Sequence, residues 1–279
     1  MRSFALLGLA AALAVPSAAP ADPLSIFQPA RVRAVSVTLA DARALRALPP
    51  LEAFGRLRGT RSPGVEEVAT AAEAAHDAGY ALRLPARVPA SLGGEVRYQV
   101  TQRARTAFTF DRTKAAAWAR EHKVALHPVP PALDGTTYTA TLDPVAVVTY
   151  GTPPKGRRSE RGARSRAFLG IVQAPLPRVV SSGASLRELA GWFAGQPGVP
   201  RHLVAQIEAI GDPTQTLPIP IRFDRQTAAK VSVDGVEGLA IGDETGIGSA
   251  VVWTKAGKLY AVGGTLSQSS ILALANDLR

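Results

Sequence analysis

A glycine-spaced stretch, GDETGIG from Gly242 to Gly248, has the composition of a loop that can wrap a phosphate group. Such a loop is made of backbone N–H groups at the start of a helix, and Lys and Ser or Thr follow its glycines. Here Gly248 is followed by SAVVW, which is typical of a strand. We therefore predict a loop between two strands. Asp243 and Glu244 lack the ligand spacing of a calcium loop, so we assign no metal or cofactor site.

The four histidines do not have the spacing of a metal site. His122 and His127 are five residues apart, whereas two ligands on one helix face are three or four apart. No cysteine is present, which excludes thiol chemistry and disulfides. The segment GIGSA has one glycine too few for a serine nucleophile elbow and leads into a strand. The sequence gives no catalytic residue, and a non-enzymatic role is favoured.

A basic segment, Lys155 to Arg166, is the main candidate for binding a partner. Guanidinium groups suit phosphate or carboxylate partners, here an anionic envelope component or an acidic protein surface. Nucleic acid is disfavoured because no aromatic residues lie between the arginines. The alternative is a solvated loop, since the chain has 26 Arg and only 6 Lys. The candidate residues are Arg157, Arg158, Arg161, Arg164 and Arg166.

Two aromatic residues, Trp253 and Tyr260, flank a predicted turn at Ala256-Gly257. A two-residue turn places them opposite one another, whereas a bulge at Gly257 places Trp253 opposite Leu259. An exposed pair would be a platform for binding a partner. The more common arrangement is a pair that packs under the helix that follows and forms part of the core.

The first 21 residues have the features of a cleaved signal peptide: Arg2, an apolar run from Phe4 to Val15, and small residues before Asp22. The run is too short to span a bilayer. We therefore expect an exported protein, periplasmic or extracellular. Residues 22–279 have the length and composition of one globular domain, with an N-terminal extension at 22–63 and an exposed loop at 151–166.

The formal net charge of +10 is concentrated in two segments. Residues 31–61 hold seven Arg against Asp41 and Glu52, and residues 155–166 hold six basic residues against Glu160. Each segment therefore carries +5, and the rest of the chain is close to neutral.

The remaining pattern predicts an α+β protein with a mainly antiparallel twisted sheet and helices on one face. A helix is expected at 62–79, capped by Ser62, and a strand in 80–94. Asp111, Ser185 and Ser267 are expected to cap three further helices. TTYTATL and VAVVTYG are expected to form a hairpin, and the C-terminal part to form a ββββα unit whose first turn is Asp234-Gly235.

The C-terminal segment VDGVEGLAIGDETGIGSAVVWTKAGKLYAVGGTLSQSSILALANDL resembles an uncharacterised extracytoplasmic bacterial family of domains of unknown function. Some members are attached to anti-sigma-factor-like proteins. Two upstream segments, GYALRLPARVPASL and LDGTTYTATLDPVAVVTYG, are also similar, so the resemblance covers Val65 to Leu278. The chain has no membrane helix after residue 21 and no cytoplasmic sigma-binding segment, and the family supplies no catalytic residue. The signal peptide and the lack of a catalytic constellation predict a non-enzymatic binding or regulatory module of the bacterial envelope, which docks a partner through the sheet or the basic segment. The alternatives are, in order, a periplasmic carrier of an apolar or lipid ligand, and a hydrolase.

Overall fold

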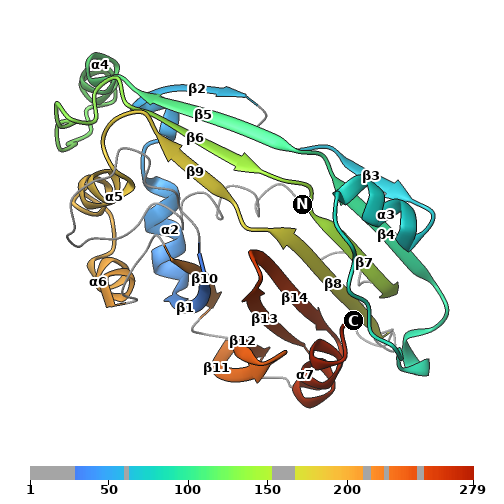
Figure 1. Cartoon of the computed structure of the whole chain (residues 1–279). Helices are drawn as coiled ribbons and strands as arrows, with labels where there is room; N and C mark the ends of the chain where they lie inside the picture. The colour runs from blue at the N-terminus through green and yellow to red at the C-terminus, as the bar shows by residue number, and fades with distance from the viewer. Residues whose placement is uncertain (1–28, 60–62, 153–166, 210–214, 223–225, 244–247) are drawn as a thin grey trace. The chain divides into compact units, whose positions relative to one another are not determined.

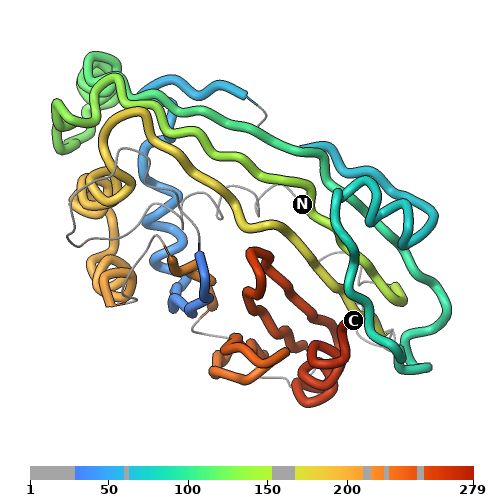
Figure 2. The backbone as a smooth tube through the Cα atoms, viewed as in Figure 1, coloured from blue at the N-terminus to red at the C-terminus, as the bar shows by residue number. Residues whose placement is uncertain are grey.

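The computed structural model describes residues 29–59, 63–152, 167–209, 215–222, 226–243 and 248–279 (Figure 1). These residues form two compact units, where the sequence predicted one domain. Unit 1 takes its residues from 1–62, 104–142 and 177–224, and unit 2 from 63–103, 143–176 and 225–279. Each unit is therefore built from three separate parts of the chain. In Figure 2, where colour follows residue number, each unit accordingly contains segments of several different colours.

Unit 1 contains a four-stranded antiparallel sheet and a separate parallel pair of strands. The strand order of the sheet is β2 (Gly55–Gly59), β5 (Ala104–Phe110), β6 (Thr137–Leu142), β9 (Arg178–Ser181). The parallel pair is β1 (Arg31–Val37) and β10 (Thr216–Arg222). The helices of the unit are α2 (Leu39–Ala47), η1 (Leu51–Ala53), α4 (Arg112–His122), α5 (Leu186–Ala194) and α6 (Arg201–Ala209).

Alternate residues of the four strands point to opposite faces of the sheet, as the pleat requires. On β5 the even-numbered residues Phe108 and Phe110 are buried, and Arg105 lies on the exposed face. The buried face packs against α5 and η1 through an apolar cluster that includes Phe54 and Leu189. Unit 1 therefore has its own hydrophobic core on one side of the sheet.

Unit 2 contains an eight-stranded antiparallel sheet with a hydrophobic core of its own. Helices α3 (Ala71–Ala78) and α7 (Gln268–Asn276) and the short helix η2 (Ala90–Leu92) complete the unit. The strand order is β11 (Gln226–Val233), β12 (Val236–Asp243), β13 (Ser249–Lys255), β14 (Lys258–Gly264), β8 (Phe168–Pro175), β7 (Ala146–Gly151), β4 (Val96–Thr101), β3 (Val65–Val68). Within the described residues, no helix is long and apolar enough to cross a membrane.

The α+β class and the ββββα ending are confirmed. Asp234 and Gly235 have φ values of 51° and 77°, and Ala256 and Gly257 have 48° and 71°, so both tight turns form as predicted. Helix α4 begins after Asp111, whose carboxylate accepts a hydrogen bond from the Lys114 N–H at 2.9 Å. The predicted caps at Ser185 and Ser267 are present as well.

The helix predicted at 62–79 is wrong in its first half. Residues Val65–Val68 form strand β3, and helix α3 begins only after Thr70. Thr70 and Glu73 form a capping box, in which each side chain accepts a hydrogen bond from the other residue's N–H. The capping box determines where the helix starts. Strand β3 is stabilised by pairing with β4, which begins about 30 residues later, so the periodicity of the segment itself does not predict β3. The predicted stop at Gly79 is confirmed, with φ at 76°.

Two further predictions are wrong. Strands β6 and β7 do not form a hairpin: β6 pairs with β5 and β9, and β7 pairs with β4 and β8. The chain passes from unit 1 to unit 2 between Leu142 and Asp143, so the two strands belong to different sheets. The strand expected in 80–94 is also missing; that segment contains one isolated bridge, Pro85 to Leu278, and helix η2.

Candidate ligand-binding site

An apolar pocket lies in unit 1 between the four-stranded sheet and helix α5, and it encloses about 50 Å³. Leu57, Phe108, Ala140 and Val179 come from four neighbouring strands, and all four point to the buried face of the sheet. Helices η1 and α5 supply the opposite wall. The complete lining is Leu51, Phe54, Leu57, Thr106, Phe108, Phe110, Tyr138, Ala140, Val179, Leu186, Leu189, Trp192 and Phe193.

Aromatic rings make the largest part of the pocket wall. Phe110 is at the centre of this group: its ring lies 4.8 Å from the ring of Phe108, 6.2 Å from that of Tyr138 and 5.4 Å from that of Trp192. All three pairs are edge-to-face, a favourable arrangement for aromatic rings. Trp192 also makes an edge contact with Phe54 at 5.1 Å. The rings therefore pack against one another as one cluster around Phe110.

The polar tips of the lining are turned away from the pocket and are already hydrogen-bonded. The Tyr138 hydroxyl donates to the carbonyl oxygens of Ala184 and Ser185, at 2.9 and 3.2 Å. The Trp192 indole N–H donates to the carbonyl oxygen of Pro128 at 3.0 Å. Burial raises the pKa of Tyr138 far above its usual range, so the hydroxyl stays protonated. The pocket therefore presents carbon surface from both side chains.

Helix α5 is held over the sheet by interactions at its first turn. Ser185 and Glu188 form the predicted capping box: the Ser185 hydroxyl accepts from the Glu188 N–H at 3.2 Å, and the Glu188 carboxylate accepts from the Ser185 N–H at 2.7 Å. The Tyr138 hydroxyl bonds to the carbonyl just before this turn. Strand β6 and the capping box together therefore position Leu186 and Leu189 at the pocket.

One side of the pocket is more open than the other. Leu51, Leu57, Thr106, Trp192 and Phe193 are partly exposed, whereas the rest of the lining is buried. The enclosed volume is about a third of the roughly 150 Å³ cavity that holds benzene. The pocket can therefore take the end of an apolar chain or one apolar side chain, while the rest of such a ligand stays at the open side.

Trp253 and Tyr260 lie in the core of unit 2 and not on its surface. They face one another across β13 and β14, as predicted for a two-residue turn, and their rings stack at 5.3 Å. Trp253 is fully buried and Tyr260 is 5% exposed. They pack with Ile271 and Leu274 of α7. The interpretation as core is therefore the one that the structure bears out, and the exposed platform is not formed.

A partly buried polar cluster in unit 2 was not predicted from the sequence. The Arg83 guanidinium bonds to the Asp234 carboxylate and donates to the carbonyl oxygen of Leu278 at 2.6 Å. Lys255 Nζ lies 2.8 Å from the same carboxylate. Gln173, 1% exposed, bonds to both the N–H and the carbonyl of Arg83. The cluster ties the segment around Arg83 to the sheet and to the C-terminus, which is a structural role.

Most of the other candidates from the sequence lie outside the described residues. They are Arg157, Arg158, Arg161, Arg164 and Arg166, together with Glu244 and the signal segment 1–21. Asp243 lies at the end of β12. In the described part of the chain there is no group of three or more His, Cys, Asp or Glu side chains that could hold a metal ion. The Asp243 N–H donates to the carbonyl oxygen of Gly248 at 3.0 Å, which closes the loop between β12 and β13.

The pocket residues carried no signal in the sequence beyond their alternation. RTAFTFD and TTYTATL alternate apolar and polar residues, as half-buried strands do, but which strands lie beside one another cannot be read from either segment. Trp192 and Phe193 follow the predicted cap at Ser185, and neither residue indicates a pocket by itself. Only the pairing of four strands from three parts of the chain brings these residues together.

The chain matches no protein-family model, no curated protein and no solved structure. The resemblance to an extracytoplasmic family, drawn from the C-terminal hairpins, therefore stays a prediction.

Proposed function

We propose that this protein is an exported, non-enzymatic binding protein of the bacterial envelope whose ligand carries an apolar chain. The end of that chain enters the pocket of unit 1. The observation that carries the proposal is the lining: aromatic and aliphatic carbon on all sides, with the polar tips of Tyr138 and Trp192 bonded elsewhere. The sequence favours a docking or regulatory module, with an apolar carrier and a hydrolase as alternatives; the apolar lining of this pocket supports the carrier.

Burial of hydrocarbon is the driving force that this site offers. Each methylene group removed from water contributes about 0.8 kcal/mol. No charged side chain belongs to the lining, so a charged headgroup stays at the open side near Leu57 and Phe193. Unbranched acyl chains fit this description. An apolar side chain of a partner protein is the alternative occupant, because the enclosed volume suits a single side chain equally well.

The first test fills the pocket from its floor. Ala140 lies on β6, is 8% exposed and lines the pocket. Ala140→Leu is expected to weaken binding of dodecanoic acid about tenfold, because displacing two buried methylene groups costs about 1.6 kcal/mol. Isothermal titration calorimetry measures this. The melting temperature should stay close to that of the wild type, since the added carbons occupy existing space.

The matched control is Ala107→Leu, the same substitution on neighbouring strand β5 but on the other face of the sheet. It is expected to leave dodecanoic acid binding unchanged. Equal loss in both variants would show that binding does not occur in the pocket. Absence of dodecanoic acid binding by the wild type, with no acyl compound in organic extracts of the exported protein, would contradict the proposed function. Crosslinking of an apolar partner side chain to Phe193 would favour the alternative occupant.

A further inference from the structure

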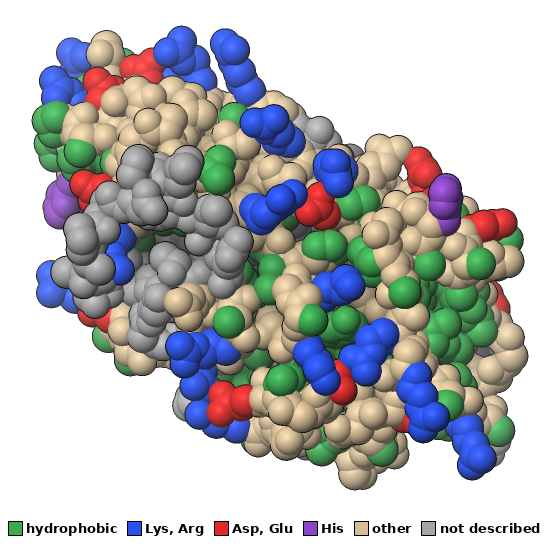
Figure 3. All heavy atoms as spheres, viewed as in Figure 1, with side chains coloured by type: hydrophobic (Ala, Val, Ile, Leu, Met, Phe, Trp, Pro, Cys, Tyr) green, Lys and Arg blue, Asp and Glu red, His purple; other side chains and the backbone are tan. Residues whose placement is uncertain are grey.

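The positive charge of the described residues lies in unit 1. Its described residues include fifteen Lys and Arg against seven Asp and Glu, a formal charge of +8. Those of unit 2 include eight basic against ten acidic residues, a formal charge of −2. In Figure 3, Lys and Arg side chains gather along the margin of unit 1 that α4 and β2 form. This asymmetry is independent of the apolar pocket.

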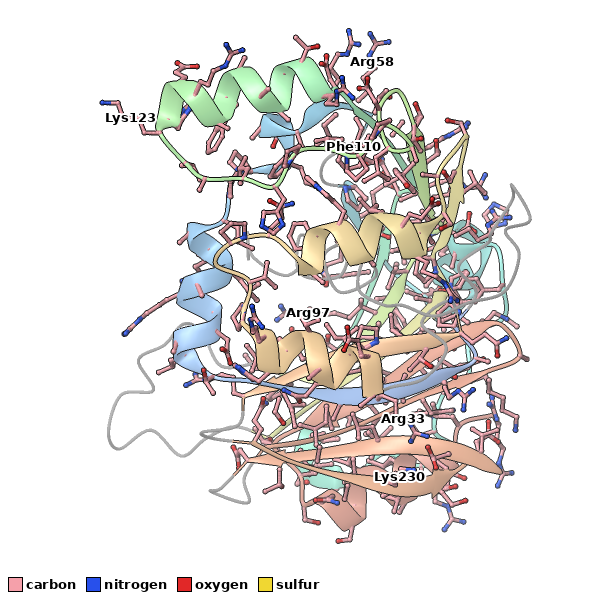
Figure 4. All side chains as sticks on the ribbon, turned by 90° about the vertical axis from the view of Figure 1, so that its left-hand side faces the viewer. Arg33, Arg58, Arg97, Phe110, Lys123 and Lys230 are labelled. Atoms are coloured by element: carbon pink, nitrogen blue, oxygen red, sulfur yellow. The ribbon has the colours of Figure 1, made fainter. Side chains whose placement is uncertain are left out.

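Four of the unit 1 arginines lie on one face of the four-stranded sheet, the face opposite the pocket. The pocket uses Leu57, Phe108, Ala140 and Val179, so the residues before and after them point the other way. Figure 4 labels Arg58, which extends outward, and Phe110, which lies inside the unit. The outward residues are Arg56 and Arg58 of β2, Arg105, Ala107 and Thr109 of β5, Thr137, Thr139 and Thr141 of β6, and Arg178 and Val180 of β9.

The register arranges these residues in rows across the strands. One row is Arg105, Thr141 and Arg178, so two arginines flank one threonine. The next row is Arg58, Ala107, Thr139 and Val180. Neighbouring strands are about 4.8 Å apart. The arginines therefore stand at the sides of a floor of short side chains. We call these ten residues the arginine-threonine face.

No Asp or Glu occupies an outward position on these four strands. Asp111 follows strand β5, and its carboxylate lies 3.8 Å from Arg56. Arg58 and Arg105 are exposed and form no ion pair within the part of the chain that the structure describes. Arg58 and Arg105 therefore give the face positive charge that no acidic side chain of the described residues pairs with.

We propose that the arginine-threonine face docks on a membrane surface of anionic lipids. Its four arginines are spread over β2, β5 and β9 and do not converge on one point, which matches an array of phosphate groups and not a single small anion. Its floor of Ala107, Thr139 and Val180 lacks large side chains that would hold a surface away. Each basic residue near such a surface strengthens binding about fivefold.

The test measures binding of the full exported chain to vesicles by sedimentation at low salt. Vesicles of equimolar phosphatidylcholine and phosphatidylglycerol should bind the protein, and vesicles of phosphatidylcholine alone should not. Arg58→Gln with Arg105→Gln is expected to lower the partition coefficient about 25-fold. The matched control is Arg43→Gln with Arg46→Gln on α2, which removes the same charge from exposed sites outside this face. It should lower the coefficient much less.

Equal losses in the two double variants would overturn the proposal, because net charge alone would then account for binding. Binding to soluble polyphosphate with none to the anionic vesicles would overturn it in favour of a polyanion. Binding to both kinds of vesicle would also overturn it. The Ala140→Leu variant should bind anionic vesicles like the wild type, so failure of the docking face and failure of the pocket are distinguishable. Thermal unfolding of each variant confirms that it is folded.

Discussion

Replacing Trp253 with alanine is expected to lower the free energy of unfolding by about 3–5 kcal/mol. The side chain is fully buried and stacks on Tyr260 in the core of unit 2. Alanine leaves a cavity beneath α7 and removes the stacked partner. Urea unfolding followed by circular dichroism measures the loss. A loss below about 1 kcal/mol, the average for any substitution, would contradict this placement of Trp253.

Trp253→Phe is the matched variant. The indole N–H of Trp253 is buried and has no hydrogen-bond partner in the described residues. An unsatisfied buried donor costs about 1–3 kcal/mol, so removing it offsets part of the lost packing. Phenylalanine also keeps a ring against Tyr260. We expect this variant to lose less than half of what Trp253→Ala loses, and an equal loss would show that the stacked ring contributes little.

Asp234→Asn is expected to cost about 2 kcal/mol at neutral pH and progressively less in acid. The carboxylate is bonded to Arg83 and lies 2.8 Å from Lys255. Asparagine keeps the turn, because it tolerates the positive φ of 51° at this position. It removes the charge and replaces one of the two carboxylate oxygens, each of which has a cationic partner, with an NH2 donor. The partners Arg83 and Lys255 are then left without an anion in a partly buried position.

The sign of the pH dependence follows from the pKa of Asp234. The hydrogen bond from Arg83 lowers this pKa; burial opposes the shift, and Lys255 reinforces it. A carboxyl whose pKa is lower in the folded than in the unfolded chain stabilises the fold above the unfolded pKa, near 3.9. That stabilisation is lost as the pH falls through the folded pKa. The difference between wild type and Asp234→Asn should therefore shrink below about pH 4.

Glu237→Gln on the same hairpin is the control for this measurement. Glu237 and Lys230 form an exposed pair at 3.3 Å, and such pairs contribute about 0–1 kcal/mol. The expected change is small. Urea midpoints measured across the acid range give both results. A constant difference between wild type and Asp234→Asn at every pH would contradict the role of the carboxylate charge.

Local signals predicted the C-terminal part of the fold well. The turns at Asp234-Gly235 and Ala256-Gly257 need residues that accept positive φ, and the helix caps need a side-chain acceptor at a fixed position. The need for glycine at position 238, in contrast, comes from close packing against neighbouring side chains, which the sequence alone does not predict. A Cβ atom there would lie 3.1 Å from that of Trp253 on β13 and 2.7 Å from a methyl of Val233.

Distant pairing accounts for what the sequence did not predict. Strand β3 exists because β4 lies beside it, and β1 because of a parallel partner more than a hundred residues away, β10. Helix α2, in the predicted N-terminal extension, is capped by Thr38 and Asp41, a pair that follows the pattern already recognised at Ser185 and Glu188. The pocket depends on the same pairing of distant segments, so no single segment of the sequence predicts it.

The most direct test of the central claim, that unit 1 binds an apolar chain, uses the chain's three tryptophans as reporters. Trp192 lines the pocket, Trp118 stacks on His122 of α4, and Trp253 lies in the core of unit 2. Titration of ¹⁵N-labelled protein with dodecanoic acid follows their indole N–H signals. The Trp192 signal should shift and saturate while those of Trp118 and Trp253 stay in place. An unchanged Trp192 signal, or a shift of Trp253 alone, would contradict the account.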